Sequence, residues 1–267
     1  MPTTPKPGVP DLGDVSLDLL KEALRRGWRD QRRTPGFGLI FSAVYVVCGW
    51  GMWLITWATG QSYWMIFAAV GFPLLGPFAA VGFYDVSRRL EQGLPLDWMQ
   101  IFGVIASQSK RQLPSICAII IIVFLFWFFL AHMIFALFMG LSTMTNVSSS
   151  VSVFLTGNGL IMLLVELVLG ALTALLIYML TVIALPMLLD REIDFVTAMI
   201  TSFGFVKSHL FPMLIWGVMI AGLTLVAMVP IFLGLFLILP LLGHATWHLY
   251  DMLAYGKAHP AAEHTAT

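Results

Sequence analysis

Apolar runs long enough to cross a membrane recur six times along this chain. A transmembrane helix needs about 20 such residues to cross a hydrocarbon core of roughly 30 Å. The predicted spans are Gly36–Trp57, Tyr63–Tyr84, Leu113–Met139, Gly159–Leu188, Phe211–Val229 and Ile231–Tyr250. The last two predict a helical hairpin with Pro230 at its turn. The pattern therefore predicts an all-α fold, a polytopic transmembrane helix bundle of about six spans.

All fourteen Lys and Arg residues lie on one side of these spans, and the opposite connections, residues 58–62 and 140–158, carry no charge. Cytoplasmic loops of membrane proteins carry an excess of Lys and Arg, so we expect both termini in the cytoplasm. Three regions follow from this pattern. Residues 1–35 are a cytoplasmic segment with a basic amphipathic helix, residues 36–250 are the six-helix transmembrane domain, and residues 251–267 are a cytoplasmic tail without fixed structure.

Composition excludes a water-soluble fold. The chain is 59% hydrophobic and 10% charged, whereas a soluble domain is about 25% charged. The net charge of zero gives no electrostatic reason to expect nucleic-acid binding. Cys48 and Cys117 lie inside apolar runs and are expected to act as small hydrophobic residues.

The segment Val15–Arg33 carries apolar residues at helical spacing and five arginines on its remaining surface. The apolar residues are Leu17, Leu20, Leu24 and Trp28, and the arginines are Arg25, Arg26, Arg29, Arg32 and Arg33. Such a helix is typical of one that lies on anionic lipid at a membrane surface. The alternative is a solvated helix that only sets the topology.

Two further cytoplasmic segments resemble each other. Asp97 and Asp194 each precede an aromatic residue, and Lys110 and Lys207 follow them by thirteen positions. Each Asp is expected to cap a helix by accepting hydrogen bonds from free backbone N–H groups. We infer a parallel internal repeat of span, cytoplasmic helix and span.

Glu166 is the one acidic residue within a predicted span, and His132 lies at the same depth in the preceding span. Carboxylates in a membrane usually face the protein interior. The pair is a candidate intramembrane polar site that could relay protons or contact a substrate. The alternatives are a protonated Glu166 bonded to a neighbouring helix, and placement near the interface.

His244 and His248 are four positions apart on the last span and share one helical face. Two histidines at this spacing can ligate one metal ion, but no further ligand is evident nearby. They form at most a weak metal pair. Bonds to the backbone or to Asp251 are the preferred expectation, so no metal or other cofactor is predicted.

No catalytic or nucleotide-binding motif occurs in the chain. The leading hypothesis is therefore a non-enzymatic accessory, assembly or scaffold component of a membrane complex, with a membrane-protein partner or a second copy as its ligand. The alternative is a small-solute or ion transporter or channel that uses Glu166. It draws support from the repeat and from Pro73 and Pro77, which interrupt the second span. A membrane-bound redox or metal protein is a third and weaker hypothesis.

The segments Pro186–Pro212 and Pro240–Tyr250, with Gly27-Trp28-Arg29-Asp30, resemble a bacterial family of predicted integral membrane proteins of unknown function. The resemblance implies a multi-pass protein of the bacterial inner membrane, and it implies no activity. Members are sometimes labelled as cytochrome c oxidase subunit I. This sequence does not fit that label, since such a subunit needs six ligand histidines within its spans, and three of the six histidines here lie outside them.

Overall fold

A computed structural model of the protein describes residues 6–60, 65–140 and 157–256. The fold is an all-α membrane helix bundle, as the sequence predicted. Within the described residues, β structure is limited to one parallel pair of two-residue strands, β1 (Lys6–Pro7) and β2 (Arg191–Glu192).

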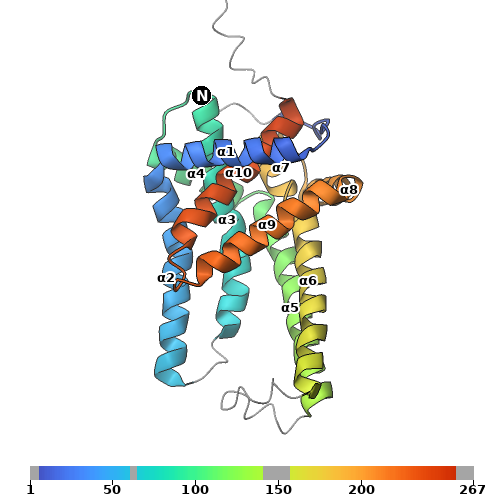
Figure 1. Ribbon diagram of the computed structural model, residues 1–267. Coiled ribbons are helices and arrows are strands. Elements are labelled where there is room, and N and C mark those ends of the chain that lie inside the picture. The colour runs from blue at the N-terminus through green and yellow to red at the C-terminus, as the bar shows by residue number, and fades with distance from the viewer. Residues whose placement is uncertain (1–5, 61–64, 141–156, 257–267) are drawn as a thin grey trace, which may run out of the picture.

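Four long helices stand roughly side by side in the bundle (Figure 1). They are α2 (Pro35–Thr59), α3 (Met65–Glu91), α5 (Leu113–Met139) and α6 (Gly157–Thr181). Four shorter helices gather at one end of them, which we call the charged end. They are α1 (Leu17–Arg33), α4 (Trp98–Gln108), α7 (Ala184–Asp190) and α8 (Phe195–Ser208).

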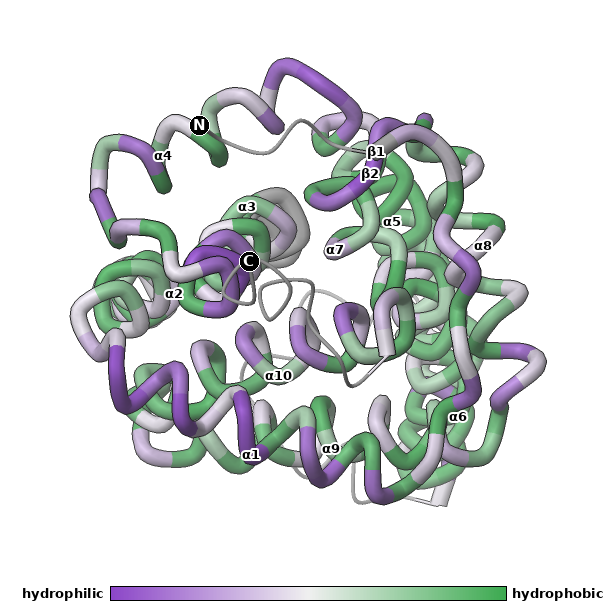
Figure 2. The backbone as a smooth tube through the Cα atoms, turned by 90° about the horizontal axis from the view of Figure 1, so that it is seen from above, coloured by the Kyte–Doolittle hydropathy of each residue, from purple (hydrophilic) through white to green (hydrophobic). Residues whose placement is uncertain are grey.

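Among the described residues, four helical segments are long and apolar enough to cross a membrane. They are Pro35–Thr59, Leu113–Met139, Gly157–Asp190 and Leu210–Met228. Viewed from the charged end, α5 and α6 are almost wholly hydrophobic, whereas α1 carries many hydrophilic residues (Figure 2). An integral membrane bundle is therefore confirmed, while the count of six spans stays a prediction.

Both of the predicted aspartate caps are present. The Asp97 carboxylate accepts a hydrogen bond from the Gln100 N–H, and the Asp194 carboxylate accepts one from the Thr197 N–H, both at 2.9 Å. These bonds satisfy backbone donors that the first turn of a helix leaves free. At α1 the cap is Ser16, which accepts from the Leu19 N–H at 3.2 Å.

The predicted fourth span is divided in two. Helix α6 ends at Thr181, and α7 begins at Ala184 after a short break. Pro186 has no N–H to donate to the carbonyl of Val182 four positions earlier, which accounts for a break here. Ser202 of α8 bridges it, because its hydroxyl donates to the Met179 carbonyl at 2.7 Å and accepts from the Ile183 N–H at 3.2 Å.

Helix α9 (Leu210–Met228) and helix α10 (Leu235–Tyr255) form an oblique hairpin across the bundle (Figure 1). Its turn contains Pro230, as expected, followed by Ile231 and Phe232 with positive φ angles of 52° and 65°. The Trp50 indole N–H of α2 donates to the Ile231 carbonyl at 2.8 Å. Trp50 lies 15 residues into α2, about 22 Å along it at 1.5 Å per residue, so the turn stops short of the far end of α2 at Thr59.

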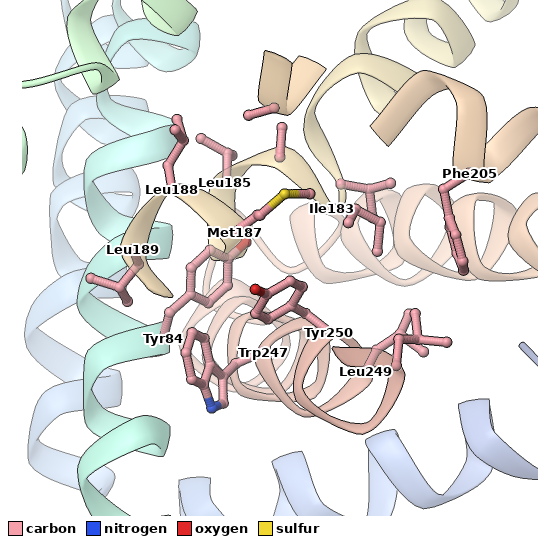
Figure 3. Packing of buried hydrophobic residues seen from close by; sticks show 14 of the residues in the cluster. Tyr84, Ile183, Leu185, Met187, Leu188, Leu189, Phe205, Trp247, Leu249 and Tyr250 are labelled. Atoms are coloured by element: carbon pink, nitrogen blue, oxygen red, sulfur yellow. The ribbon is translucent and has the colours of Figure 1, made fainter. Parts of the chain in front are cut away.

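The main apolar core lies near the charged end, around α7. All six residues from Ala184 to Leu189 are buried. They pack with Tyr84 of α3 and with Trp247 and Tyr250 of α10 (Figure 3). Helix α10 continues to Tyr255, five residues beyond the predicted sixth span. This core fixes the α3 and α10 backbones beside α1.

Candidate functional site: a buried polar cluster between three helices

Three helices meet at the charged end, and each presents two polar residues spaced four apart. The pairs are Arg26 and Asp30 on α1, Ser87 and Glu91 on α3, and His244 and His248 on α10. This spacing places both members on one face of a helix. We call these six residues the polar cluster.

His248 is held between two carboxylates. Its Nε2 lies 2.6 Å from Oδ2 of Asp30, and its Nδ1 lies 2.9 Å from Oε1 of Glu91. His248 and the Asp30 side chain are both almost fully shielded from solvent, at 0% and 1% exposed. Buried charges of this kind are tolerated when they are paired, so His248 ties α1 and α3 to α10.

Ser87 connects the second histidine to the same aspartate. Its hydroxyl donates to Oδ2 of Asp30 at 3.0 Å and lies 2.8 Å from Nδ1 of His244. The Ser87 hydroxyl has one hydrogen, which it uses in the bond to Asp30. Toward His244 it can therefore only accept, so Nδ1–H of His244 is the donor in that bond. This arrangement fixes one tautomer of a neutral His244.

Three further contacts surround the two carboxylates of the cluster. The Trp247 indole N–H donates to Oε2 of Glu91 at 3.1 Å. Nη1 of Arg26 lies 3.8 Å from Oε1 of Glu91, and Nε of Arg29 lies 3.4 Å from Oδ1 of Asp30. The two carboxylates are thus balanced by His248 and by arginines of α1.

Small residues on α1 make the close approach possible. The buried face of α1 consists of Leu20, Ala23, Gly27, Asp30 and Gln31. A Cβ atom at Gly27 would lie 2.7 Å from the Ala245 backbone nitrogen, a distance at which something must move. Gly27 therefore lets α1 and α10 touch backbone to backbone, one turn before Asp30 meets His248.

Burial and hydrogen bonding act in opposite directions on Asp30. Burial on its own would raise the pKa of this carboxyl, but its hydrogen bonds to His248 and Ser87 and the positive charge of His248 outweigh burial, so the pKa lies below its usual range. Asp30 is accordingly ionised at neutral pH. The cluster is an internal ion pair rather than a neutral hydrogen-bond network.

A second polar group reinforces the same end. Asp85 forms ion pairs with Arg88 and, at 2.7 Å, with Nε of Arg89. Arg89 also donates to the side-chain oxygen of Gln100 at 2.8 Å and to the Pro95 carbonyl at 3.2 Å, which holds α4 against α3.

The sequence pointed to His244 and His248 but not to their partners. Asp30, Ser87 and Glu91 had no role in the prediction, although the buried face of α1 and the spacing of Ser87 and Glu91 carry the signal. The contacts given above for these histidines involve Asp30, Ser87 and Glu91, while the expected bond to Asp251 stays a prediction. Within the described residues, no group of three or more His, Cys, Asp or Glu side chains could hold a metal ion.

Glu166 and His132 lie far from this cluster, on α6 and α5. Glu166 is partly exposed. Nδ1 of His132 lies 2.8 Å from the Phe128 carbonyl of its own helix, so it can bond within that turn. No hydrogen bond or ion pair joins the two residues in the described structure, so the candidate pair stays a prediction.

The arginines of α1 divide into two groups. Arg25, Arg29, Arg32 and Arg33 are exposed, whereas Arg26 is half-buried and pairs with Glu22 at 2.9 Å. The apolar stripe divides too, because Leu20 is buried against the protein while Leu17 and Trp28 are exposed. The prediction that α1 contacts anionic lipid therefore applies only to its exposed side, where it stays a prediction.

A central cavity of about 250 Å³ lies between α2, α3, α6, α9 and α10. Its lining is mostly apolar and includes Tyr45, Phe83, Tyr178, Thr181, Thr224 and Thr246. The Phe83 ring also contacts the His244 ring, with centroids 5.4 Å apart. The cavity thus borders the polar cluster, and its lining contains neither Glu166 nor His132.

Residues 65–190 match the model of a family described as "Predicted integral membrane protein (DUF2189)". This match confirms the resemblance to a family of integral membrane proteins of unknown function. It covers α3 to α7 and includes Ser87 and Glu91, but not Asp30, His244 or His248. The chain matches no curated protein and no solved structure.

Proposed function

We propose that this integral membrane protein, which carries the DUF2189 family match over residues 65–190, is a non-catalytic accessory component of the bacterial inner membrane. In this proposal it docks another membrane protein through the outer surface of α5 and α6, and both of its termini are cytoplasmic. The polar cluster has a structural role, which is to hold α1 in place.

The observation that carries the proposal is the poor packing of α6. Only 6% of the most apolar stretch of this span is buried within the chain, against 28% for the α2 span. Large apolar side chains are exposed along most of α6: Leu160, Ile161, Leu163, Leu164, Leu167, Val168, Leu172 and Leu176. Lipid can cover such a surface, so apolarity alone does not indicate a partner.

Glu166 is what favours a protein partner on this surface. It lies nine residues into α6, about 14 Å along the helix, and its side chain is only partly buried. Carboxylates within a membrane are costly and usually face protein. A partner helix that offers a hydrogen-bond donor to Glu166, with His132 beside it, would remove this cost.

The neighbouring helix offers a matching apolar stripe. Exposed side chains of α5 recur at intervals of three and four residues, which defines a single helical face: Ile122, Phe126, Phe129, Met133 and Leu137. Two of them are phenylalanines, which supply large contact areas. The proposed docking surface therefore consists of this stripe and the adjoining face of α6.

Site-specific crosslinking in native membranes tests the proposal. A photo-crosslinking residue replaces Leu167 on α6, and a control replaces Leu54 on α2, which is also exposed. We expect a discrete, stoichiometric crosslinked product at position 167 and lipid adducts alone at position 54. Glu166→Gln should weaken co-purification of that product in mild detergent. Lipid adducts at both positions would contradict the proposal.

The central cavity favours transport of a small solute as a second candidate. A cavity among several helices beside titratable groups is a common setting for a binding site, although Glu166 and His132 do not line it. Ala80→Phe would fill it. If the protein is a transporter, this change should abolish uptake in proteoliposomes while leaving the α5–α6 crosslink unchanged.

A further inference from the structure

A second pocket lies where α1 joins α2, and we call it the corner pocket. It has a volume of about 250 Å³. Trp28, Gln31 and Arg32 come from the end of α1, Leu39 from the first turns of α2, and Phe236 and Leu237 from α10. Neither the polar cluster nor the α5–α6 docking surface includes any of these residues.

Gln31 leaves one polar atom without a partner beside this pocket. The residue is 8% exposed, and its Nε2 donates to the Leu237 carbonyl at 2.9 Å. That bond fixes the orientation of the amide, because a carbonyl oxygen can only accept. Oε1 of Gln31 is buried and has no hydrogen-bond partner. A buried acceptor of this kind calls for a donor.

Arg32 supplies an unpaired positive charge at the mouth of the same pocket. It is exposed and forms no ion pair with any of the described residues. Arginine binds phosphate oxygens through its planar set of N–H donors. Its neighbour Arg33 is also exposed but does not line the pocket.

The rest of the lining is apolar and lies beside the first turns of α2, a helix long and apolar enough to cross a membrane. Leu39 is 59% exposed on α2, one turn after the helix begins, and Trp28 is 43% exposed on α1. Tryptophan favours the boundary between headgroups and acyl chains. A ligand held here would therefore have a polar end at Arg32 and an apolar end along Leu39 and Phe236.

We infer that the corner pocket binds a single phospholipid whose headgroup carries an N–H or O–H donor, as ethanolamine does. Its phosphate lies on Arg32, its headgroup donor bonds to Oε1 of Gln31, and an acyl chain follows Leu39 and Phe236. The terminal torsion of glutamine is soft, so a small rotation of the amide lets Oε1 meet the donor. A choline headgroup satisfies the phosphate contact but has no hydrogen to donate.

Native mass spectrometry of the detergent-purified full chain tests this site. Phosphatidylethanolamine and phosphatidylcholine with identical chains are added in turn, so that only the headgroup donors differ. We expect the first bound lipid to favour ethanolamine by about tenfold, the change in affinity that one hydrogen bond commonly gives. Equal binding of the two lipids would overturn the inference.

Matched arginine variants separate a defined site from general attraction to a basic surface. Arg32→Ala should weaken the first binding event for both lipids, whereas Arg33→Ala should leave it unchanged. Equal loss in the two variants would overturn the inference. Gln31→Met should retain binding but lose the preference for ethanolamine. If Gln31→Met does not fold, the headgroup comparison and the arginine pair still decide the matter.

Discussion

Nε2 of His248 lies 2.6 Å from Oδ2 of Asp30, a residue 218 positions earlier in the chain. The contact joins α1 to α10 at a point where both side chains are buried. It shows that one face of α1 is built into the bundle, while contact of the exposed face with lipid stays a prediction.

Replacing the aspartate should destabilise the protein strongly. Asp30→Asn keeps the shape of the side chain but removes the charge that balances His248. Breaking a buried ion pair from one side costs about 3–5 kcal/mol of the free energy of unfolding. Unfolding in mixed micelles by increasing SDS measures this loss. The control is Asp11→Asn, at an exposed position of the preceding segment. Equal stability of the two variants would show that the polar cluster does not stabilise the docking of α1.

The approach of α1 to α10 depends on the absence of a side chain at Gly27. Gly27→Ala places a methyl group 2.7 Å from the Ala245 backbone nitrogen, and the overlap should cost about 1–3 kcal/mol. Gly103→Ala in the interior of α4 meets no atom within 4 Å. It should instead stabilise its helix by up to about 1 kcal/mol, the propensity difference between the two residues. Thermal unfolding followed by circular dichroism compares the pair, and a loss of stability in both would reject this explanation.

Stability should fall in acid through Asp30. Its pKa is lower in the folded protein than in the unfolded chain, where it is about 3.9. Its contribution is therefore complete above about pH 4 and is lost as the pH falls through the folded-state pKa. Hydrogen bonds from Arg25 and then Arg26 lower the pKa of Glu22 to about 2, in the same direction, but that group is screened by solvent. Denaturation curves at successive pH values should show a shallower acid decline in Asp30→Asn than in the parent protein.

One hydroxyl group stabilises the break between α6 and α7, because Ser202 bonds to backbone groups on both sides of it. Ser202→Ala removes the acceptor of the buried Ile183 N–H, and an unsatisfied buried donor costs about 1–3 kcal/mol. Ser208→Ala, in the same helix, removes an exposed hydroxyl that bonds only to near neighbours in sequence, the Phe205 carbonyl at 2.9 Å and Nδ1 of His209 at 3.1 Å. It should change stability by less than about 0.5 kcal/mol. The difference between the two unfolding midpoints is the test, and a smaller loss at Ser202 than at Ser208 would refute it.

Cysteine labelling tests the predicted orientation. In a background of Cys48→Ala and Cys117→Ala, a membrane-impermeant thiol reagent should modify Thr59→Cys from the periplasmic side of intact cells. Gln92→Cys, in the turn after α3, should react only after the inner membrane is permeabilised, because its side carries the basic residues. The reverse labelling pattern would contradict the predicted orientation and place the basic side in the periplasm.

Long apolar segments were the most predictable part of the fold. Helix α5 has the bounds predicted for the third span, residue for residue, because Gln112 and Gly140 flank a long run that is almost wholly apolar. The break at Val182–Ile183 lies inside a continuous apolar run. Hydropathy cannot reveal it, so the sequence predicted one unbroken span to Leu188 where the structure has two helices.

The site was less predictable, for a different reason. The spacing of His244 and His248 identified a polar face of the last helix. Spacing within one helix does not show which other helix packs against that face. Asp30 lies among the arginines of α1, so its sequence neighbours suggest ion pairs within α1 rather than a contact with α10. Its partner is set by the packing of Gly27 on Ala245, which pairs two segments with no local relation in the sequence.

The separation of Asp30 from His248 also has a consequence in time. At about 5–20 residues per second, synthesis of the intervening 218 residues takes roughly 10–40 s. During that interval α1 carries a carboxylate whose binding partner does not yet exist, so α1 must wait in water or at the membrane surface. Docking of α1 therefore waits for α10, and a chain that ends before residue 244 lacks both histidines of the cluster that holds α1 in place.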